Sequence, residues 1–322
     1  MLGSLTGETS FFASGRDALA SLLTKLPYGT VHLPDLICQS VYQACQYAGK
    51  EVRTYQIEPD LINTHSELCA EGSCIIVMHY FGVANEQLIR RAKSLGMTVI
   101  SDVTHMLFNP GQMDFLSSAS DYLVASLRKS GPFPDGGFIS SRRHRVPLAS
   151  KGLREAFFTL RTTGLFSRGF SARQDFINDE NFALLRKAES LLDQSLLGDF
   201  ECSYLSMELL RTIGVDESAR KMIKNISMLS SKIIGSYKTI CTTSAPSPYY
   251  VCLFENQEKR DLIKSTLTKH QYFFPVHWDT HYAQQPSLLS DLMFSIPCDT
   301  RYNEADMESI ALIINSCLTC QK

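Results

Sequence analysis

The first half of the chain alternates apolar runs with amphipathic segments. The runs that predict strands occupy residues 30–34, 51–57, 73–81, 97–103 and 122–126. Between them, apolar positions recur at helical spacing at residues 17–26, 40–49 and 85–96. Two of these segments end at a glycine, Gly49 and Gly96, a common residue just beyond a helix end. This rhythm predicts an α/β fold with a mainly parallel sheet flanked by helices.

The segment SCIIVMHYF, residues 73–81, is a continuous apolar run, which is typical of a strand covered on both faces. In open parallel sheets, ligands bind at the carboxyl ends of the strands. The polar residues that directly follow the predicted strands are therefore the first candidates for a functional site.

From about residue 150 the pattern changes to long helical segments, at residues 181–197 and 218–234. The last part predicts strands at 249–254 and 292–297 and helices at 259–270 and 305–317. Because 322 residues exceed the usual size of a single core, we expect more than one domain. We expect a large α/β domain at residues 1–165, a helical connection at 166–235 and a small C-terminal α/β domain at 236–322.

Composition and charge narrow the class of protein. Hydrophobic residues make up 44% and charged residues 20% of the chain, the ordinary balance of a globular protein. The formal net charge of -2 gives no electrostatic reason to expect nucleic acid or an anionic membrane as a partner. We expect the partner to be a small molecule or another copy of the chain.

The N-terminus lacks the basic start and apolar core of a signal peptide, and no apolar run is long enough to span a bilayer. The ten cysteines follow no regular spacing, and the one Cys-x-x-C pair, Cys317 and Cys320, has no second pair to complete a zinc site. These features predict a cytoplasmic protein with free thiols and no metal centre.

Three short polar groups could carry chemistry, and the first is Ser14-Gly15-Arg16-Asp17 at the start of a predicted helix. Free backbone N–H groups at a helix start form a site for an anion such as phosphate, and Gly15 permits close approach. Plain helix capping is the alternative for this group.

The second group, Ser101 to His105, lies at the end of a buried strand. A carboxylate there, Asp102, needs a cationic or hydrogen-bonding partner, and a protonated pyridine nitrogen is such a partner. The alternative is that Asp102 caps a turn and that His105 is a satisfied neighbour.

The third group follows the strand at residues 122–126. Ser126 and Lys129 have an S-x-x-K spacing, and the pair Gly136-Gly137 lies just downstream. A lysine amine in such a place can attack a carbonyl. The alternative is a solvent-facing lysine in a polar loop.

Taken in this order, the three groups resemble the large domain of the aspartate-aminotransferase superfamily. More narrowly, the chain resembles the DegT/DnrJ/StrS-type nucleotide-sugar aminotransferases over almost its whole length. The segments that carry the resemblance include FFASGRDALASLL, IIVMHYFG, VISDVTHML, SLRKSGPFPDGG and FSIPCDTRYNEADM. The resemblance implies pyridoxal 5'-phosphate (PLP) as cofactor and the PLP-dependent transferase fold, with a mainly parallel seven-stranded sheet and a small C-terminal α/β domain.

The resemblance also implies roles for individual residues. Lys129 would form the internal Schiff base and later move the proton between the substrate carbon and the cofactor. Asp102 would pair with the pyridine nitrogen and keep it protonated, so that the ring accepts electrons. His105 occupies the place near the phenolic oxygen of the cofactor.

The phosphate would be held by the backbone around Gly15, Arg16 and Asp17 and by the hydroxyl of Ser126. One cofactor-binding position departs from the family pattern, because Cys38 stands where many relatives place an aromatic residue over the ring. The residues that could cover that face instead are Tyr42, Tyr80 and His79.

The leading hypothesis is transfer of an amino group, from glutamate, to a keto-sugar that is often nucleotide-linked in this family, for polysaccharide or secondary-metabolite sugar synthesis. A PLP-dependent lyase, dehydratase or racemase is one alternative, although sugar dehydratases of the family carry histidine at the position of Lys129. A non-catalytic sugar-binding relative is the other, and only Cys38 supports it. No G-x-G-x-x-G motif opens the first strand–helix turn, which argues against a nicotinamide-dependent enzyme.

The tail offers four candidates for substrate contact, because comparable loops of the family lie near the active site: His277, Trp278, Arg301 and Tyr302. The alternatives are packing of the small domain for Trp278 and a surface ion pair for Arg301. The family works as a homodimer, and we expect a homodimer here.

Overall fold

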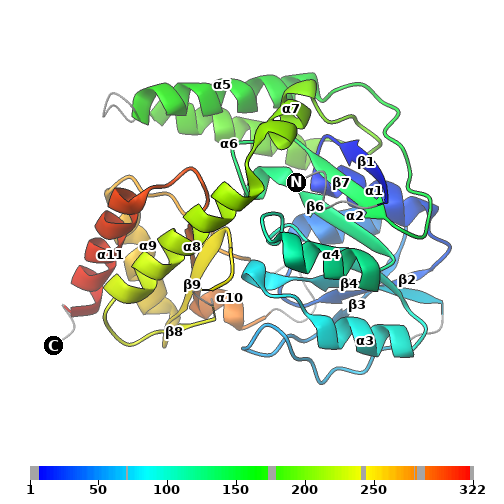
Figure 1. Cartoon of the computed structure of the whole chain (residues 1–322), viewed down its shortest axis with the longest axis horizontal. Helices are drawn as coiled ribbons and strands as arrows, with labels where there is room; N and C mark the ends of the chain where they lie inside the picture. The colour runs from blue at the N-terminus through cyan, green and yellow to red at the C-terminus, as the bar shows by residue number, and fades with distance from the viewer. Residues whose placement is uncertain are drawn as a thin grey trace.

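The computed structural model describes residues 7–69, 72–172, 179–240, 244–278, 280 and 287–319. Its larger part is built on a seven-stranded sheet with the order β1-β7-β6-β5-β4-β2-β3 (Figure 1). The strands are β1 (Glu8–Phe12), β2 (Thr30–Pro34), β3 (Glu51–Tyr55), β4 (Ser73–Met78), β5 (Thr98–Asp102), β6 (Tyr122–Ser126) and β7 (Gly137–Ser141).

The five strands from β6 to β3 pair in parallel along the sheet. β7 is antiparallel to β6, and β1 is antiparallel to β7. This confirms the predicted mainly parallel sheet of seven strands. The carboxyl ends of β2, β4, β5 and β6 therefore share one edge, where the polar residues after these strands meet.

Helices cover both faces of the sheet, and alternate residues of β4 enter two different cores. Cys74 and Ile76 pack with the helices on one face, and Ile75 and Val77 pack with those on the other. The helices are α1 (Gly15–Lys25) and α2 (Gln39–Tyr47) on the first face and α3 (Glu86–Ser94) and α4 (Pro110–Ala119) on the second. The continuous apolar run of β4 is thus explained by burial on both sides.

The predicted strand at residues 73–81 is too long. β4 ends at Met78, and the chain then enters a short 3-10 turn, η2 (Tyr80–Gly82), in which Phe81 has a positive φ of 48°. The apolar residues beyond Met78 are buried against the small part of the molecule instead of continuing the sheet.

Two antiparallel helices, α5 (Glu155–Ala172) and α6 (Asp179–Gln194), lie side by side above the sheet (Figure 1). α6 matches the helix predicted at 181–197, whereas α5 and α7 (Tyr204–Thr212) were not predicted. α8 (Val215–Lys232) then crosses to the smaller part, as the helical pattern at 218–234 predicts.

The smaller part holds a three-stranded antiparallel sheet with the order β10-β9-β8. Its elements are β8 (Lys238–Thr239), β9 (Tyr249–Leu253), α9 (Gln257–Lys269), α10 (Leu289–Leu292), β10 (Met293–Pro297) and α11 (Glu304–Thr319). Its core also includes Ile226 and Leu229 of α8. The domain boundary expected at residue 236 stays a prediction.

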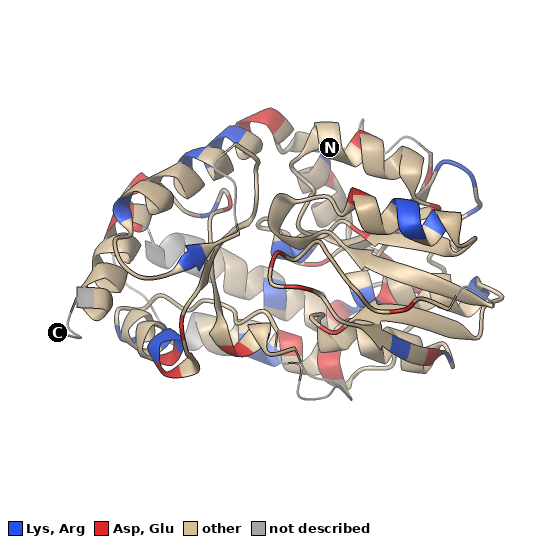
Figure 2. Cartoon of the chain, turned by 90° about the horizontal axis from the view of Figure 1, so that it is seen from below, with Lys and Arg blue, Asp and Glu red and all other residues tan. Residues whose placement is uncertain are grey.

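Charged residues of both signs are spread over both parts of the molecule (Figure 2). Within the described ranges, no helix is long and apolar enough to cross a bilayer.

Candidate active site

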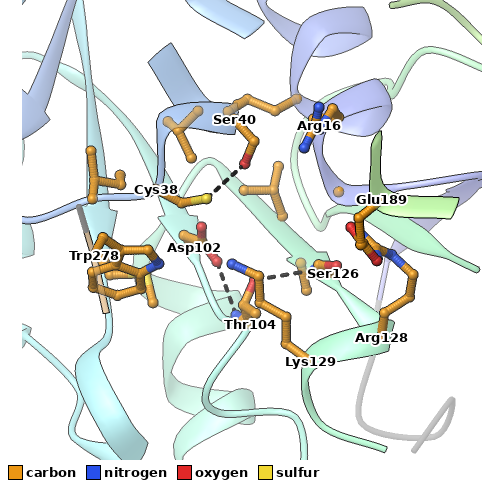
Figure 3. A pocket seen from close by; sticks show the side chains of 17 residues that line it. Arg16, Cys38, Ser40, Asp102, Thr104, Ser126, Arg128, Lys129, Glu189 and Trp278 are labelled. Atoms are coloured by element: carbon orange, nitrogen blue, oxygen red, sulfur yellow. Dashed lines mark hydrogen bonds and ion pairs between the residues drawn. The ribbon is translucent and has the colours of Figure 1, made fainter. Parts of the chain in front are cut away.

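The carboxyl edge of the sheet borders a cavity of about 140 Å³ between α1, α2, β5 and β6 (Figure 3). Many of the residues singled out in the sequence line it together: Gly15, Arg16, Cys38, Asp102, Ser126, Lys129 and Trp278. The loops that follow three different strands and the start of α1 therefore meet at one place, and Trp278 closes it from the smaller part.

Asp102 and Lys129 lie on the floor of this cavity (Figure 3). Asp102 is the last residue of β5, and its Oδ1 accepts a hydrogen bond of 3.0 Å from the backbone N–H of Thr104. Burial raises the pKa of the Asp102 carboxyl, and the hydrogen bonds from Thr104 and the charge of Lys129 offset this only in part. Asp102 is thus a carboxylate that a further cationic partner would stabilise.

Lys129 ends η3 (Leu127–Lys129), a 3-10 turn directly after β6. Its Nζ lies 5.9 Å from the centroid of the Trp278 ring, and it makes no salt bridge within the part of the chain that the structure describes. Its backbone carbonyl accepts a hydrogen bond of 3.4 Å from the hydroxyl of Tyr249. The backbone of Lys129 is therefore tied down, while its amine faces the cavity.

The start of α1 forms the other end of the cavity. Ser14 caps the helix, because its Oγ accepts from the N–H of Asp17 at 3.1 Å. A Cβ on Gly15 would lie 2.9 Å from the Cβ of Ser126, and one on Gly137 would lie 2.4 Å from the backbone nitrogen of Gly15. Both glycines are needed for this close approach of helix and strand. The Ser126 hydroxyl is buried and has no hydrogen-bond partner in the described ranges.

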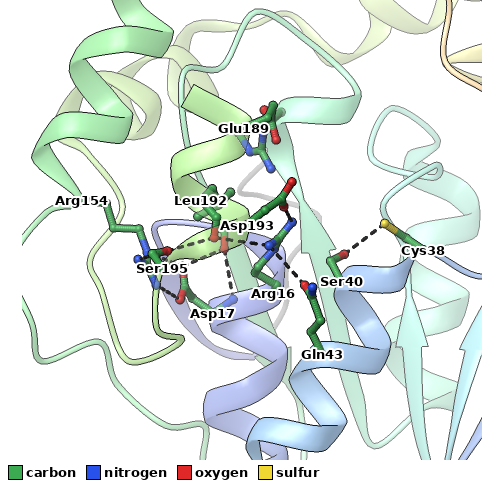
Figure 4. A network of polar contacts seen from close by, with 12 residues as sticks. Arg16, Asp17, Cys38, Ser40, Gln43, Arg154, Glu189, Leu192, Asp193 and Ser195 are labelled. Carbon is green, nitrogen blue, oxygen red and sulfur yellow. Dashed lines mark hydrogen bonds and ion pairs between the residues drawn. The ribbon is translucent and has the colours of Figure 1, made fainter. Parts of the chain in front are cut away.

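The side chain of Asp17 does not line the cavity, although the sequence suggested Asp17 as part of the anion site. Asp17 is 0% exposed, and its two oxygens accept from Arg154 Nη2 at 2.6 Å and Nε at 3.0 Å (Figure 4). Its N–H is engaged by Ser14. Asp17 therefore anchors the first turn of α1 to Arg154, outside the cavity that Gly15 and Arg16 line.

A cluster of arginines lies near Ser126, and the sequence predicted only one of them, Arg16, as a site residue. Arg16 donates to Asp193 at 2.6 Å, and Arg128 and Arg161 both donate to Oε1 of Glu189, the latter at 2.9 Å. Burial raises the pKa of Glu189, but the charges of Arg128 and Arg161 lower it by more. The pKa of Glu189 therefore lies below its usual range. Glu189 is thus held ionised between two guanidinium groups.

Cys38 is the N-cap residue of α2 and lines the cavity. Its Sγ accepts a hydrogen bond of 3.2 Å from the hydroxyl of Ser40. Burial raises the pKa of the Cys38 thiol, but the charge of Lys129 and the hydrogen bonds from Ser40 lower it by more, and the net shift is downward.

Of the three residues considered as a substitute for the aromatic residue at Cys38, all of which the structure describes, none lines the cavity. Tyr42, Tyr80 and His79 do not line the cavity, and the hydroxyl of Tyr80 is used by the carbonyl of Leu36 at 2.5 Å. Within the described ranges Trp278 is the one aromatic side chain in the cavity wall. It was predicted as a substrate contact and stands next to the cofactor candidates.

His105 lies behind Trp278 and does not line the cavity. Its ring packs nearly parallel to those of Trp278, at 5.8 Å, and Phe81, at 4.9 Å, and these two rings lie 6.3 Å from each other. Burial, together with the charges of His277 and Lys129, lowers its pKa well below the usual range, so the ring is neutral. Because Nδ1 accepts from the N–H of Phe81 at 3.4 Å, the proton resides on Nε2, which is buried without a partner in the described ranges.

His277 is buried in the same group, with its ring 4.5 Å from that of Tyr249 and its Nδ1 without a partner among the described residues. Arg301 and Tyr302 are outside the cavity lining. Arg301 forms a bidentate pair with Asp299, at 2.7 and 2.6 Å. The substrate contacts expected of Arg301 and Tyr302 stay predictions. In the described part of the chain no group of three or more His, Cys, Asp or Glu could hold a metal ion.

No protein-family profile matches the chain, and no curated protein matches it by sequence. Solved structures do match it. Spr1654 from Streptococcus pneumoniae, described as a sugar aminotransferase, has a TM-score of 0.68 and 16% identity, covering 98% of this chain and 87% of its own. It was also solved in PLP and PMP forms.

PseC from Helicobacter pylori, an aminotransferase of pseudoaminic acid biosynthesis, has a TM-score of 0.68 and 14% identity, with 98% of this chain and 88% of its own covered. DesI, solved in the presence of its TDP-sugar product, has a TM-score of 0.65 and 14% identity, with 98% and 82% covered. The chain has the fold of the PLP-dependent sugar aminotransferases. The predicted transferase fold is thereby confirmed over nearly the whole chain, and the cavity described above lies at the carboxyl edge of its main sheet.

Proposed function

We propose that this transferase-fold chain is a PLP-dependent aminotransferase that moves an amino group from glutamate to a nucleotide-linked keto-sugar. The observation that carries the proposal is the shared cavity of Lys129 and Asp102, with the start of α1 and the free Ser126 hydroxyl at its other end. The names of the solved relatives, which are sugar aminotransferases, support the same reaction.

The residues of the cavity fit PLP. A phosphate placed at the start of α1 would satisfy the buried Ser126 hydroxyl and would meet the N–H groups of Gly15 and Arg16. A side chain on Gly15 would fill that cradle. A protonated pyridine nitrogen would supply the cationic partner that buried Asp102 needs.

When bound, PLP supplies a conjugated ring that delocalises negative charge from the substrate carbon. Asp102 would hold the proton on the ring nitrogen, because an ion pair in a low-dielectric site favours the charged form of both groups. Lys129 would supply the amine that receives the proton from the substrate carbon and returns it to the cofactor side.

The group of buried rings next to Lys129 would keep water out and receive the substrate. His105 is neutral and offers an N–H at Nε2, and His277 has an unused Nδ1. Trp278 forms the wall between these histidines and the cavity. The roles that we propose for these residues are contact with the substrate for His277, Trp278, Arg301 and Tyr302, and for His105 an influence on the phenolic side of the cofactor through the ring of Trp278.

We also propose that the enzyme is a cytoplasmic homodimer. Exposed large apolar side chains on α5, just after α6 and at the start of α7 support an interface, since Phe166 is 61%, Leu196 84% and Tyr204 75% exposed. Sedimentation at micromolar concentration should give twice the mass of the chain. A monomer would contradict the proposed dimer but not the proposed reaction.

The reaction is tested by mixing the PLP-loaded protein with glutamate. We expect the visible absorption of lysine-bound cofactor to disappear while pyridoxamine phosphate and 2-oxoglutarate form. Lys129→Ala should abolish this conversion, and Lys264→Ala, at an exposed position of α9, should leave it unchanged. If no amino donor converts the cofactor, transamination is the wrong reaction.

A further inference from the structure

Arg128 is a charged cavity residue whose hydrogen bonding is incomplete. It lies between Ser126 and Lys129 in the chain, its side chain is 11% exposed, and its guanidinium lies 5.3 Å from the centroid of the Phe157 ring. Nη1 donates to Glu189, whereas Nε is buried and has no partner in the described part of the chain. A buried guanidinium N–H without an acceptor is costly unless a ligand supplies one.

The charges around Arg128 do not balance. Glu189 faces two guanidinium groups, those of Arg128 and Arg161, so this trio carries one surplus positive charge. The nearby Arg16 is already paired with Asp193. Burial and the charge of Arg128 lower the pKa of Arg161 to about 10, as expected where positive charge is incompletely compensated. An anion in the cavity would remove this imbalance.

Arg128 and Arg161 face different spaces, although they share Glu189. Arg128 lines the cavity with Gly15 and Ser126 (Figure 3), whereas Arg161 lines an open pocket between α5 and α6. Glu189 borders both spaces. An anion at the start of α1 is therefore next to Arg128 and is separated from Arg161 by the carboxylate.

We infer that Arg128 is a cationic contact of the cofactor phosphate and that Glu189 competes with the phosphate for this guanidinium. The inference rests on the proposed function, because it takes PLP as the occupant of the cavity. A guanidinium has five N–H donors in one plane, so Arg128 can keep Glu189 on one edge and donate to a phosphate oxygen from another. Because Glu189 belongs to α6, this helix would lower the affinity for the cofactor phosphate through its competition for Arg128.

The test compares PLP with pyridoxal, which has the same ring and aldehyde but no phosphate. Dissociation constants for both are measured on the cofactor-free full chain by absorbance. Arg128→Gln should raise the constant for PLP by about 10- to 100-fold, the loss expected for one charge-assisted hydrogen bond, and leave that for pyridoxal within about threefold. Arg128→Lys should restore part of the affinity for PLP.

Two matched variants separate a contact from a general effect of charge. Arg161→Gln removes the same charge from the same carboxylate but faces the other pocket, and it should change PLP binding by less than about threefold. Glu189→Gln should tighten PLP binding, because it removes the competitor. Inorganic phosphate should compete with PLP in the wild type and more weakly in Arg128→Gln.

The outcomes are distinct. If Arg128→Gln weakens PLP and pyridoxal equally, Arg128 acts only by positioning Lys129, and the inference is overturned. Equal losses in Arg128→Gln and Arg161→Gln would overturn it as well, because no direct contact is then required. If the wild-type protein binds neither compound, the proposed function itself fails.

Discussion

Removal of the Asp17 carboxylate should destabilise the protein by more than the loss of an exposed carboxylate on a helix surface. Asp17 is 0% exposed and accepts two hydrogen bonds from Arg154, whose side chain is 7% exposed. The same carboxylate accepts from the hydroxyl of Ser14 at 2.7 Å and from the N–H of Gly198 at 3.2 Å. Asp17→Ala leaves all of these donors without their acceptor (Figure 4).

The magnitude follows from the burial of the pair. Removing one partner of a buried ion pair costs about 3–5 kcal/mol, because the remaining charge stays in a low-dielectric place without compensation. An exposed pair is worth about 0–1 kcal/mol. Lys232 and Glu308, at 3.4 Å and with side chains 51% and 55% exposed, form such a pair and provide the control.

Urea unfolding followed by circular dichroism measures both effects. We expect Asp17→Ala to lower the free energy of unfolding by about 3–5 kcal/mol and Glu308→Ala by less than about 1 kcal/mol. Equal losses in the two variants would refute the conclusion that the Asp17–Arg154 pair anchors α1.

Three further predictions concern the cavity itself. Burial raises the pKa of Asp102, so its ionised form costs stability at neutral pH. Asp102→Asn should therefore stabilise the cofactor-free protein at pH 7, with a gain that disappears as the pH falls toward about 4, and should abolish transamination. A loss of stability at pH 7 would oppose this account. Trp278 is the only tryptophan of the chain and lines the cavity, so PLP should quench its fluorescence, whereas unchanged emission would place the cofactor elsewhere. Iodoacetamide should modify Cys38 before Cys45, because burial raises the pKa of the Cys45 thiol to about 12 whereas the pKa of Cys38 is lowered. PLP should protect Cys38 from this modification. Equal labelling of the two thiols in mass spectrometry would speak against a lowered pKa at Cys38.

Four of the five parallel strands of the large sheet, β2, β4, β5 and β6, are predictable because each is a mostly buried run, and the edge strand β3 is predictable from its β-branched and aromatic residues. β1 and β7 are not, since ETSFF and GFISS are short, mix polar and apolar residues, and pair with each other across more than a hundred residues. α5 escapes prediction because its sequence, EAFFTLRTTGLFSRGFSA, contains glycines and threonines that disfavour a helix in isolation. Its packing against α6 overrides this propensity.

The chemistry of the site divides in the same way. Asp102, Ser126 and Lys129 are predictable, because residues that follow parallel strands meet at one edge of the sheet. Glu189 is not, since its place in the cavity depends on how the α5–α6 pair lies over α1, which no local pattern encodes. The direction of the Asp17 side chain likewise depends on Arg154, a residue 137 positions away in the chain.

Covalent attachment of the cofactor tests the central claim most directly. The PLP-loaded protein is reduced with borohydride, digested and analysed by mass spectrometry. We predict a phosphopyridoxyl group on Lys129 in the wild type and its loss from that peptide in Lys129→Ala, with Asp102→Asn still labelled. A stable label on a different lysine, or none, would contradict a cofactor site between Lys129 and Asp102.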